Sequence, residues 1–142
     1  MPEKRTRKRA AKAKRQGKSG STQGGEYVRE EIHHVREGKH GARSTKQAIA
    51  IGLSKARRAG VKVPSPKGKA AKKRARQESA RKGRKPSGTR ARASSRALKR
   101  EGHSAGSKKA VSRQAKTAAR KRTAASRSAS ARKAARTRAR RR

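Results

Sequence analysis

The sequence predicts a mostly α-helical protein, in which a short two-helix hairpin is flanked by basic tails that are disordered or only conditionally helical. The formal net charge is +41 and only 27% of the residues are hydrophobic, a composition typical of disordered polycations. The Ile, Leu and Val residues lie in residues 23–63, apart from Leu98 and Val111. In that segment apolar residues recur at helical spacing, which indicates helices rather than strands.

Charge divides the chain into three segments. Residues 1–22 have nine Lys or Arg and one Glu, and we expect a basic, disordered N-terminal tail. Residues 23–63 have nine basic and four acidic residues, a balance that favours a small folded unit. Residues 64–142 form a basic C-terminal tail rich in Ala, Arg, Lys and Ser, with thirty basic and two acidic residues. Because like charges oppose a free helix, we expect this tail to become helical, chiefly at 89–100 and 107–122, when phosphates neutralise it.

The first helix of the hairpin is predicted over Glu26–Glu37. Val28, Ile32 and Val35 recur there at positions i, i+4 and i+7, which places them on one helical face. Gly38 follows and is a natural helix stop.

The second helix is predicted to begin after Ser44. Ser44 and Gln47 have the spacing of a capping box, in which the two side chains satisfy amide groups at the helix start. Gly52 on the inner face would let a neighbouring helix approach closely. Gly60 and Pro64 then end the unit. The residues expected on the inner face are Ile49, Gly52, Leu53, Ala56 and Ala59.

Residues 44–60, STKQAIAIGLSKARRAG, resemble a family of small, basic bacterial proteins of uncharacterised function that share a KQAIAIGLS-type segment. The resemblance covers about residues 26–63 and implies a bacterial origin and a small helical unit, without an established activity. The C-terminal tail is similar to the Ala/Lys/Arg tails of linker-histone-like bacterial nucleoid proteins, which act through charge. A unit of about 40 residues has a very small core, so a homodimer through residues 26–63 is one way to stabilise it.

The excess charge predicts a polyanionic partner, because solubility alone needs a net charge of only about 2–8 on a small domain. Tyr27 is the only Phe, Trp or Tyr residue, so stacking on single-stranded bases is not expected, and duplex DNA is favoured over RNA. The function expected is that of a histone-like, nucleoid-associated protein that neutralises and compacts DNA in the bacterial cytoplasm. The expected phosphate contacts are Arg43, Lys46, Arg57, Arg58, Arg90, Arg92, Lys108, Lys109, Arg120, Lys121, Arg122, Arg132, Arg140, Arg141 and Arg142.

No enzyme, cofactor, metal site or small-molecule substrate is expected. Adjacent residues of a helix point apart, so neither Glu30 with Glu31 nor His33 with His34 makes an obvious pair, and there is no Cys or Asp. The four glutamates of the middle segment are interpreted as solvated helix charges. A membrane partner is not expected, because no apolar run approaches the roughly 18 residues of a spanning helix and no secretory signal is visible.

Two alternatives stay open. A ribosome-associated structural protein would use the same basic extensions to contact RNA phosphates. A membrane-active cationic peptide would need a strong apolar helix face, which the tails almost entirely lack.

Overall fold

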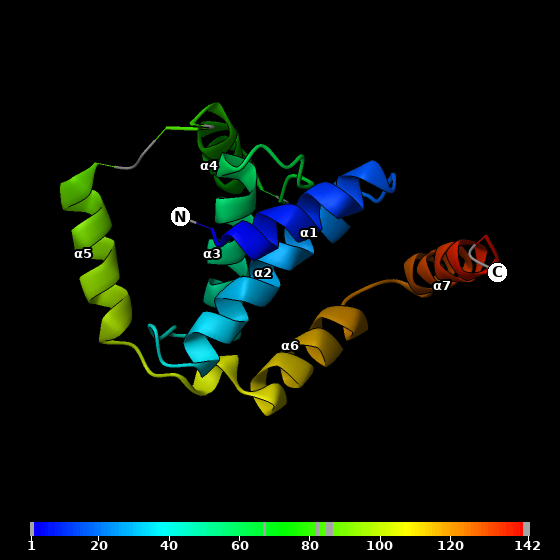
Figure 1. Ribbon diagram of the computed structural model, residues 1–142. Coiled ribbons are helices and arrows are strands. Elements are labelled where there is room, and N and C mark those ends of the chain that lie inside the picture. Colours follow the sequence, from blue (N-terminus) through cyan, green and yellow to red (C-terminus); the bar gives the residue numbers. More distant parts are fainter. Residues whose placement is uncertain (1, 67, 82, 85–86, 141–142) are drawn as a thin grey trace. The chain divides into compact units, whose positions relative to one another are not determined.

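The computed structural model describes residues 2–66, 68–81, 83–84 and 87–140. Over these ranges it has seven α-helices, one short 3-10 helix and no β-strand, so the mostly α fold class is confirmed (Figure 1). The chain divides into two compact units, Met1–Ser107 and Lys108–Arg142. In chain order the helices are α1 (Lys4–Arg15), α2 (Gly20–Arg36), α3 (Thr45–Arg58), α4 (Lys69–Ala80), α5 (Gly88–Lys99), η1 (Ser104–Gly106), α6 (Lys108–Arg120) and α7 (Ala124–Ala139).

The N-terminal segment is helix α1, so the prediction of a disordered tail there is wrong. Thr6, Ala10 and Ala13 are buried, and α1 packs against α2 (Figure 1). Three small side chains at helical spacing give a basic helix a narrow face that another helix can cover. Gly17, with φ +65°, turns the chain between α1 and α2.

Helix α2 begins six residues earlier than predicted, at Gly20. Ser19 caps it by accepting a hydrogen bond from the amide of Thr22 at 3.4 Å. Residues 62–63, which follow α3, pack against α2 at Gly20 and Gly24. A Cβ on Gly20 would lie 1.8 Å from the Lys62 carbonyl oxygen, and one on Gly24 3.0 Å from Val63. The glycines here therefore serve close packing.

Helices α2 and α3 pack closely, but the prediction of a two-helix hairpin is wrong, because α1 also packs on α2. Gly38, with φ +74°, follows the end of α2, as predicted. Ser44 caps α3 by accepting from the Gln47 amide at 3.2 Å, which confirms the predicted start. Gly52 lies directly against α2, because a Cβ there would be 2.6 Å from the Cα of Val28. The hairpin is thus part of a larger assembly rather than the whole fold.

The core is built mostly of alanine. Tyr27, Ala10 and Ala56 form a buried cluster, with Val61 and Val63 packed against it. Tyr27 is only 3% exposed. The buried face of α3 differs from the predicted one. Gly52 and Ala56 are buried as expected, but Ile49 and Leu53 are half-buried and Ala59 is exposed. The other buried residues of α3 are Thr45, Ala48, Ser54 and Arg57. Small residues on facing helices allow backbones to approach closely, which partly compensates for the lack of large side chains.

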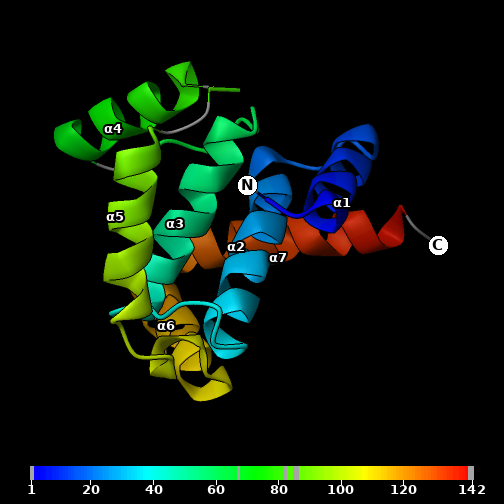
Figure 2. The same ribbon diagram turned by 60° about the vertical axis from the view of Figure 1, so that its left-hand side comes forward.

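Part of the predicted C-terminal tail packs on this helical core. Ala75 of α4 is buried, and Glu78 of α4 pairs with Arg57 of α3 at 2.9 Å; Figure 2 shows α4 beside the C-terminal end of α3. Farther along, η1 packs against α2 and α3. Thr45 donates a hydrogen bond to the Ala105 carbonyl oxygen at 2.8 Å, and Gly41 donates one to the Leu98 carbonyl oxygen at 2.9 Å. The folded unit therefore extends well beyond residue 63.

The prediction that the C-terminal tail is disordered is also wrong. The residue ranges of helices α5 and α6 nearly coincide with the stretches 89–100 and 107–122 that were expected to be helical, and α7 follows them in the chain. None of these three helices has a buried residue. Ala, Arg and Lys are good helix formers, and Ser87 and Thr123 cap α5 and α7 through side-chain hydrogen bonds. Local propensity and capping therefore account for helices that packing does not hold.

Candidate functional site

Most of the carboxylates form ion pairs with Lys, Arg or His side chains of the first compact unit. Among the described residues, only four Lys or Arg side chains lie within 4 Å of a carboxylate oxygen. They are Arg9 with Glu26 at 4.0 Å, Lys39 with Glu37 at 3.1 Å and with Glu3 at 3.4 Å, Lys55 with Glu31 at 2.5 Å, and Arg57 with Glu78 at 2.9 Å. The remaining described Lys and Arg residues have no acidic partner, so their charge is available to an external anion.

The four predicted contacts on α3 and the preceding turn fall into two groups. Arg43 and Lys46 are exposed. Arg58 is also exposed, and its Nη2 donates to the Ser54 hydroxyl at 2.9 Å. Arg57 differs because it is 9% exposed and its guanidinium pairs with Glu78. Arg57 thus joins α3 to α4 and, unlike the other three residues, has little of its surface in contact with solvent.

The predicted contacts farther along the chain lie on exposed helices. Arg90 and Arg92 are exposed on α5. In the C-terminal unit the exposed positions are Lys108, Lys109 and Arg120 on α6, Lys121 and Arg122 between α6 and α7, Arg132 on α7, and Arg140 at its end. Arg122 donates from Nη2 to the carbonyl oxygen of Ser126 at 2.9 Å. Arg141 and Arg142 lie outside the described residues.

Helix α6 has a basic stripe, of which the predicted phosphate contacts included only Lys109 and Arg120. Lys109, Arg113, Lys116 and Arg120 are all exposed and lie at i, i+4, i+7 and i+11. At 100° per residue these positions fall within about 60° of one another, along about 16 Å of helix axis. The spacing was readable from the sequence, but it becomes a face only once the segment is known to be helical.

The only aromatic ring of the Phe, Trp and Tyr class is in the core. Tyr27 is 3% exposed and packs with Ala10 and Ala56, so it cannot stack on a base. Burial also raises the pKa of its phenol above the usual value of 10.0. Base stacking, which single-strand binders use, is not offered by this residue.

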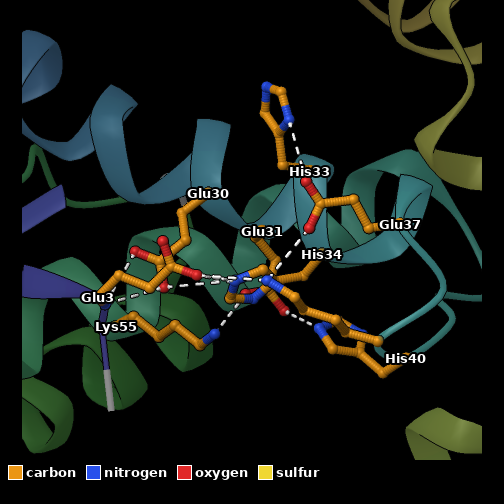
Figure 3. A network of polar contacts seen from close by, with 9 residues as sticks. Glu3, Glu30, Glu31, His33, His34, Glu37, His40 and Lys55 are labelled. Carbon is orange, nitrogen blue, oxygen red and sulfur yellow. Dashed lines mark hydrogen bonds and ion pairs between the residues drawn. The ribbon is translucent and has the colours of Figure 1, made fainter. Parts of the chain in front are cut away.

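A second group of polar residues is buried between α2, the turn after it, and α3 (Figure 3). Glu31 is fully buried, at 0% exposed, and Glu30 is 6% exposed, so the interpretation of these two glutamates as solvated charges is wrong. Lys55 of α3 contacts Oε2 of Glu31 at 2.5 Å. His40 reaches back from the turn, and its Nε2 lies 3.1 Å from Oε1 of Glu31.

The other side of the cluster joins α2 to the start of α1. Nε2 of His34 lies 2.9 Å from Oε1 of Glu3, and the Glu3 amide donates to Oε1 of Glu30 at 3.3 Å (Figure 3). The hydrogen bond from His34, followed by one from Lys39, lowers the pKa of the Glu3 carboxyl below its ordinary value. These contacts fix the N-terminus of α1 on α2.

The fold brings together Glu31, His34 and His40, a combination that was not predicted from the sequence. A ring nitrogen from each of His34 and His40 and an oxygen of Glu31 all lie within 4.8 Å of one another. The adjacent residues His33 and His34 point apart on the helix, whereas Glu31 and His34, three residues apart on α2, share a face. The Glu-x-x-His spacing was the available signal, but the approach of His40 depends on the turn.

None of the helices in the described part of the chain is both long enough and apolar enough to cross a membrane. No curated protein and no solved structure matches the chain. Residues 3–67, a little under half of the chain, match the model of a family of unknown function, DUF6496. The match takes in α1 together with α2 and α3. The resemblance to this family therefore covers the three-helix core and does not extend to the basic helices that follow it.

Proposed function

We propose that this protein is a non-enzymatic, histone-like DNA-binding protein that neutralises and compacts duplex DNA through phosphate contacts. One observation carries the proposal. Helices α5, α6 and α7 have no acidic residue and no buried residue, so each presents cations to solvent along its length. Neutralising phosphates would release condensed counterions and relieve the repulsion within the chain.

The helical form of the basic segments sharpens the proposal. The stripe on α6, formed by Lys109, Arg113, Lys116 and Arg120, places four cations on one side of a rod about 16 Å long. Duplex DNA carries one phosphate charge per about 1.7 Å of axis, so one stripe can follow one stretch of backbone. Because Tyr27 is buried, nothing comparable supports base stacking.

Compaction follows if separate basic helices of one chain hold separate stretches of duplex. The exposed cations lie in both compact units, on α3 and α5 in the first and on α6 and α7 in the second. Linking several weak phosphate sites in one chain raises the overall affinity through effective concentration. We place this activity at the nucleoid of a bacterial cell.

Binding to duplex DNA and to structured RNA of equal charge, measured over a salt series, tests the proposal. We expect DNA to bind more tightly, with log affinity falling against log salt at a slope of about −9 for ten phosphates. Tighter binding to RNA at every salt concentration would replace the proposal with the ribosome-associated alternative. Sedimentation of DNA with the protein would report compaction directly.

A variant of the α6 stripe locates the contacts. Replacing Lys109, Arg113, Lys116 and Arg120 together by Ala should make the salt slope shallower by about 3–4, because each lost phosphate contact contributes about 0.9. The matched control, Arg113→Lys with Arg120→Lys, keeps the charge and the helix and should leave the slope unchanged. An unchanged slope in the Ala variant would remove α6 from the interface.

A further inference from the structure

We propose that Glu31, His34 and His40 form a binding site for a divalent transition-metal ion, with Zn²⁺ as the best match. The three side chains offer one carboxylate oxygen and two imidazole nitrogens within 4.8 Å of one another. Two histidines and a glutamate are a ligand set that Zn²⁺ accepts, with solvent in the fourth position. The proposal is independent of the DNA-binding function.

The hydrogen bonds of His40 favour a cation beside it. Nδ1 of His40 lies 2.9 Å from the Gly41 carbonyl oxygen, which can only accept, so Nδ1 carries the proton. In the neutral ring Nε2 then has a lone pair, and Nε2 lies 3.1 Å from Oε1 of Glu31. Two acceptors at this distance need a proton between them, on His40 or on Glu31, or a metal ion that both can bind. A backbone carbonyl on the far nitrogen is also the usual support of a metal-bound histidine.

Glu31 supplies the second argument. Its side chain is 1% exposed, and no described residue makes a hydrogen bond to Oε1, since the contact with His40 is not aligned as one. A buried carboxylate oxygen without a hydrogen bond is costly unless another group compensates its charge. Lys55 contacts Oε2, the other oxygen, and thus leaves Oε1 for a ligand on the histidine side. Tetrahedral Zn²⁺ places neighbouring ligand atoms about 3.3 Å apart, close to the 3.1 Å between Oε1 of Glu31 and Nε2 of His40.

His34 completes the set from the same helix. Its Nε2 lies 2.9 Å from the Glu3 carboxylate, and the tautomer that donates there keeps a lone pair on Nδ1. Its ring meets that of His40 edge to face, with centroids 6.1 Å apart. A carboxylate behind a ligating histidine orients the ring and raises its basicity.

A metal at this point would hold the turn between α2 and α3. His40 belongs to that turn, and the amide of its neighbour Gly41 donates a hydrogen bond to the carbonyl oxygen of Leu98 in α5. Metal binding contributes to folding free energy when the site exists only in the folded state. In a protein whose core is mostly alanine, such a contribution would be large relative to packing.

The ring nitrogens of the four histidines, observed by ¹⁵N NMR in the full chain after treatment with a chelator, give the direct test. On addition of Zn²⁺ we expect shifts to metal-bound values for His34 and His40, and none for His33 and His103. Imidazolium signals for His40 that Zn²⁺ does not change would overturn the proposal and assign the contact with Glu31 to a protonated histidine. This measurement needs no variant and is unaffected by folding defects.

Calorimetric titration with Zn²⁺ provides the second readout. We expect one site per chain, an affinity lowered at least about tenfold in His40→Asn and in Glu31→Gln, and no comparable change in His33→Asn. His33 is a matched control, because it is adjacent to His34 on α2 but its side chain is 47% exposed and pairs with Glu37 instead of with Glu31. Equal losses in His33→Asn and His40→Asn would show diffuse surface binding and refute the site.

Discussion

Replacing Gly52 by Ala tests the close contact on which the three-helix core depends. The new Cβ would lie 2.6 Å from the Cα and 2.9 Å from the amide nitrogen of Val28, and 3.0 Å from the carbonyl oxygen of Tyr27. All three atoms belong to the backbone of α2, so no side chain can rotate away. The two helices would have to move apart by about 1 Å to reach ordinary contact distance.

The expected cost follows from two opposed effects. Overpacking typically costs about 1–3 kcal/mol, and separation of the helices would also loosen Ala48 and Ala56, which are 0% exposed. Alanine in a helix interior is better than glycine by about 1 kcal/mol. Since the contacted atoms belong to the backbone, we take the upper end of the overpacking cost, about 3 kcal/mol, and expect a net loss of about 2 kcal/mol in the free energy of unfolding. For a unit of about 100 residues this is a fall in Tm of about 10 °C.

Urea unfolding at fixed salt, followed by the fluorescence of Tyr27, measures this loss. Tyr27 is buried beside Gly52, so its signal reports on the core and not on the exposed helices α5 to α7. Gly25→Ala is the matched control, because Gly25 lies within α2 and has no atom within 4 Å of its added Cβ. It should stabilise the unit by about 0.5–1 kcal/mol. If both variants were stabilised equally, the close packing of α2 on α3 would be refuted.

Three further predictions use other contacts. Glu78→Gln should leave the buried guanidinium of Arg57 without its ion pair and release α4, seen as faster amide exchange in α4 but not in α2; unchanged exchange would show that the pair does not hold α4. Because the hydrogen bond from His34 lowers the pKa of Glu3 in the folded state, the stability from this contact is present above the unfolded pKa and is lost as pH falls through the folded value. Glu3→Gln should therefore flatten the acid side of the stability profile, and an identical profile would contradict this. Burial raises the pKa of Tyr27, so phenolate absorbance should appear only above pH 10.0, and stability should fall as pH rises through the folded pKa; titration at 10.0 would contradict its burial.

Local features of the fold could be predicted because they depend on neighbouring residues. The caps and stops at Ser44 and Gly38 satisfy or end a helix through their own backbone geometry, and they are where the sequence placed them. Two of the four α-helices of the C-terminal region, α5 and α6, were also located, because Ala, Arg and Lys favour helix wherever they occur, whereas α4 and α7 were not predicted. The prediction that these stretches are disordered without a bound polyanion was wrong, because helix propensity and capping outweigh the charge repulsion between their basic side chains.

By itself, then, the sequence determined the helical class, the cap at Ser44, the stop at Gly38, the close packing at Gly52 and the large excess of positive charge. Only the tertiary structure decided that α1 packs on α2, that Glu31 is buried beside His40, and that Arg57 faces Glu78. The physical reason is that alanine carries little hydrophobic signal, so a face built from it becomes apparent only when a second helix covers it. Contacts between distant residues depend on how such faces meet, and no single segment contains that information.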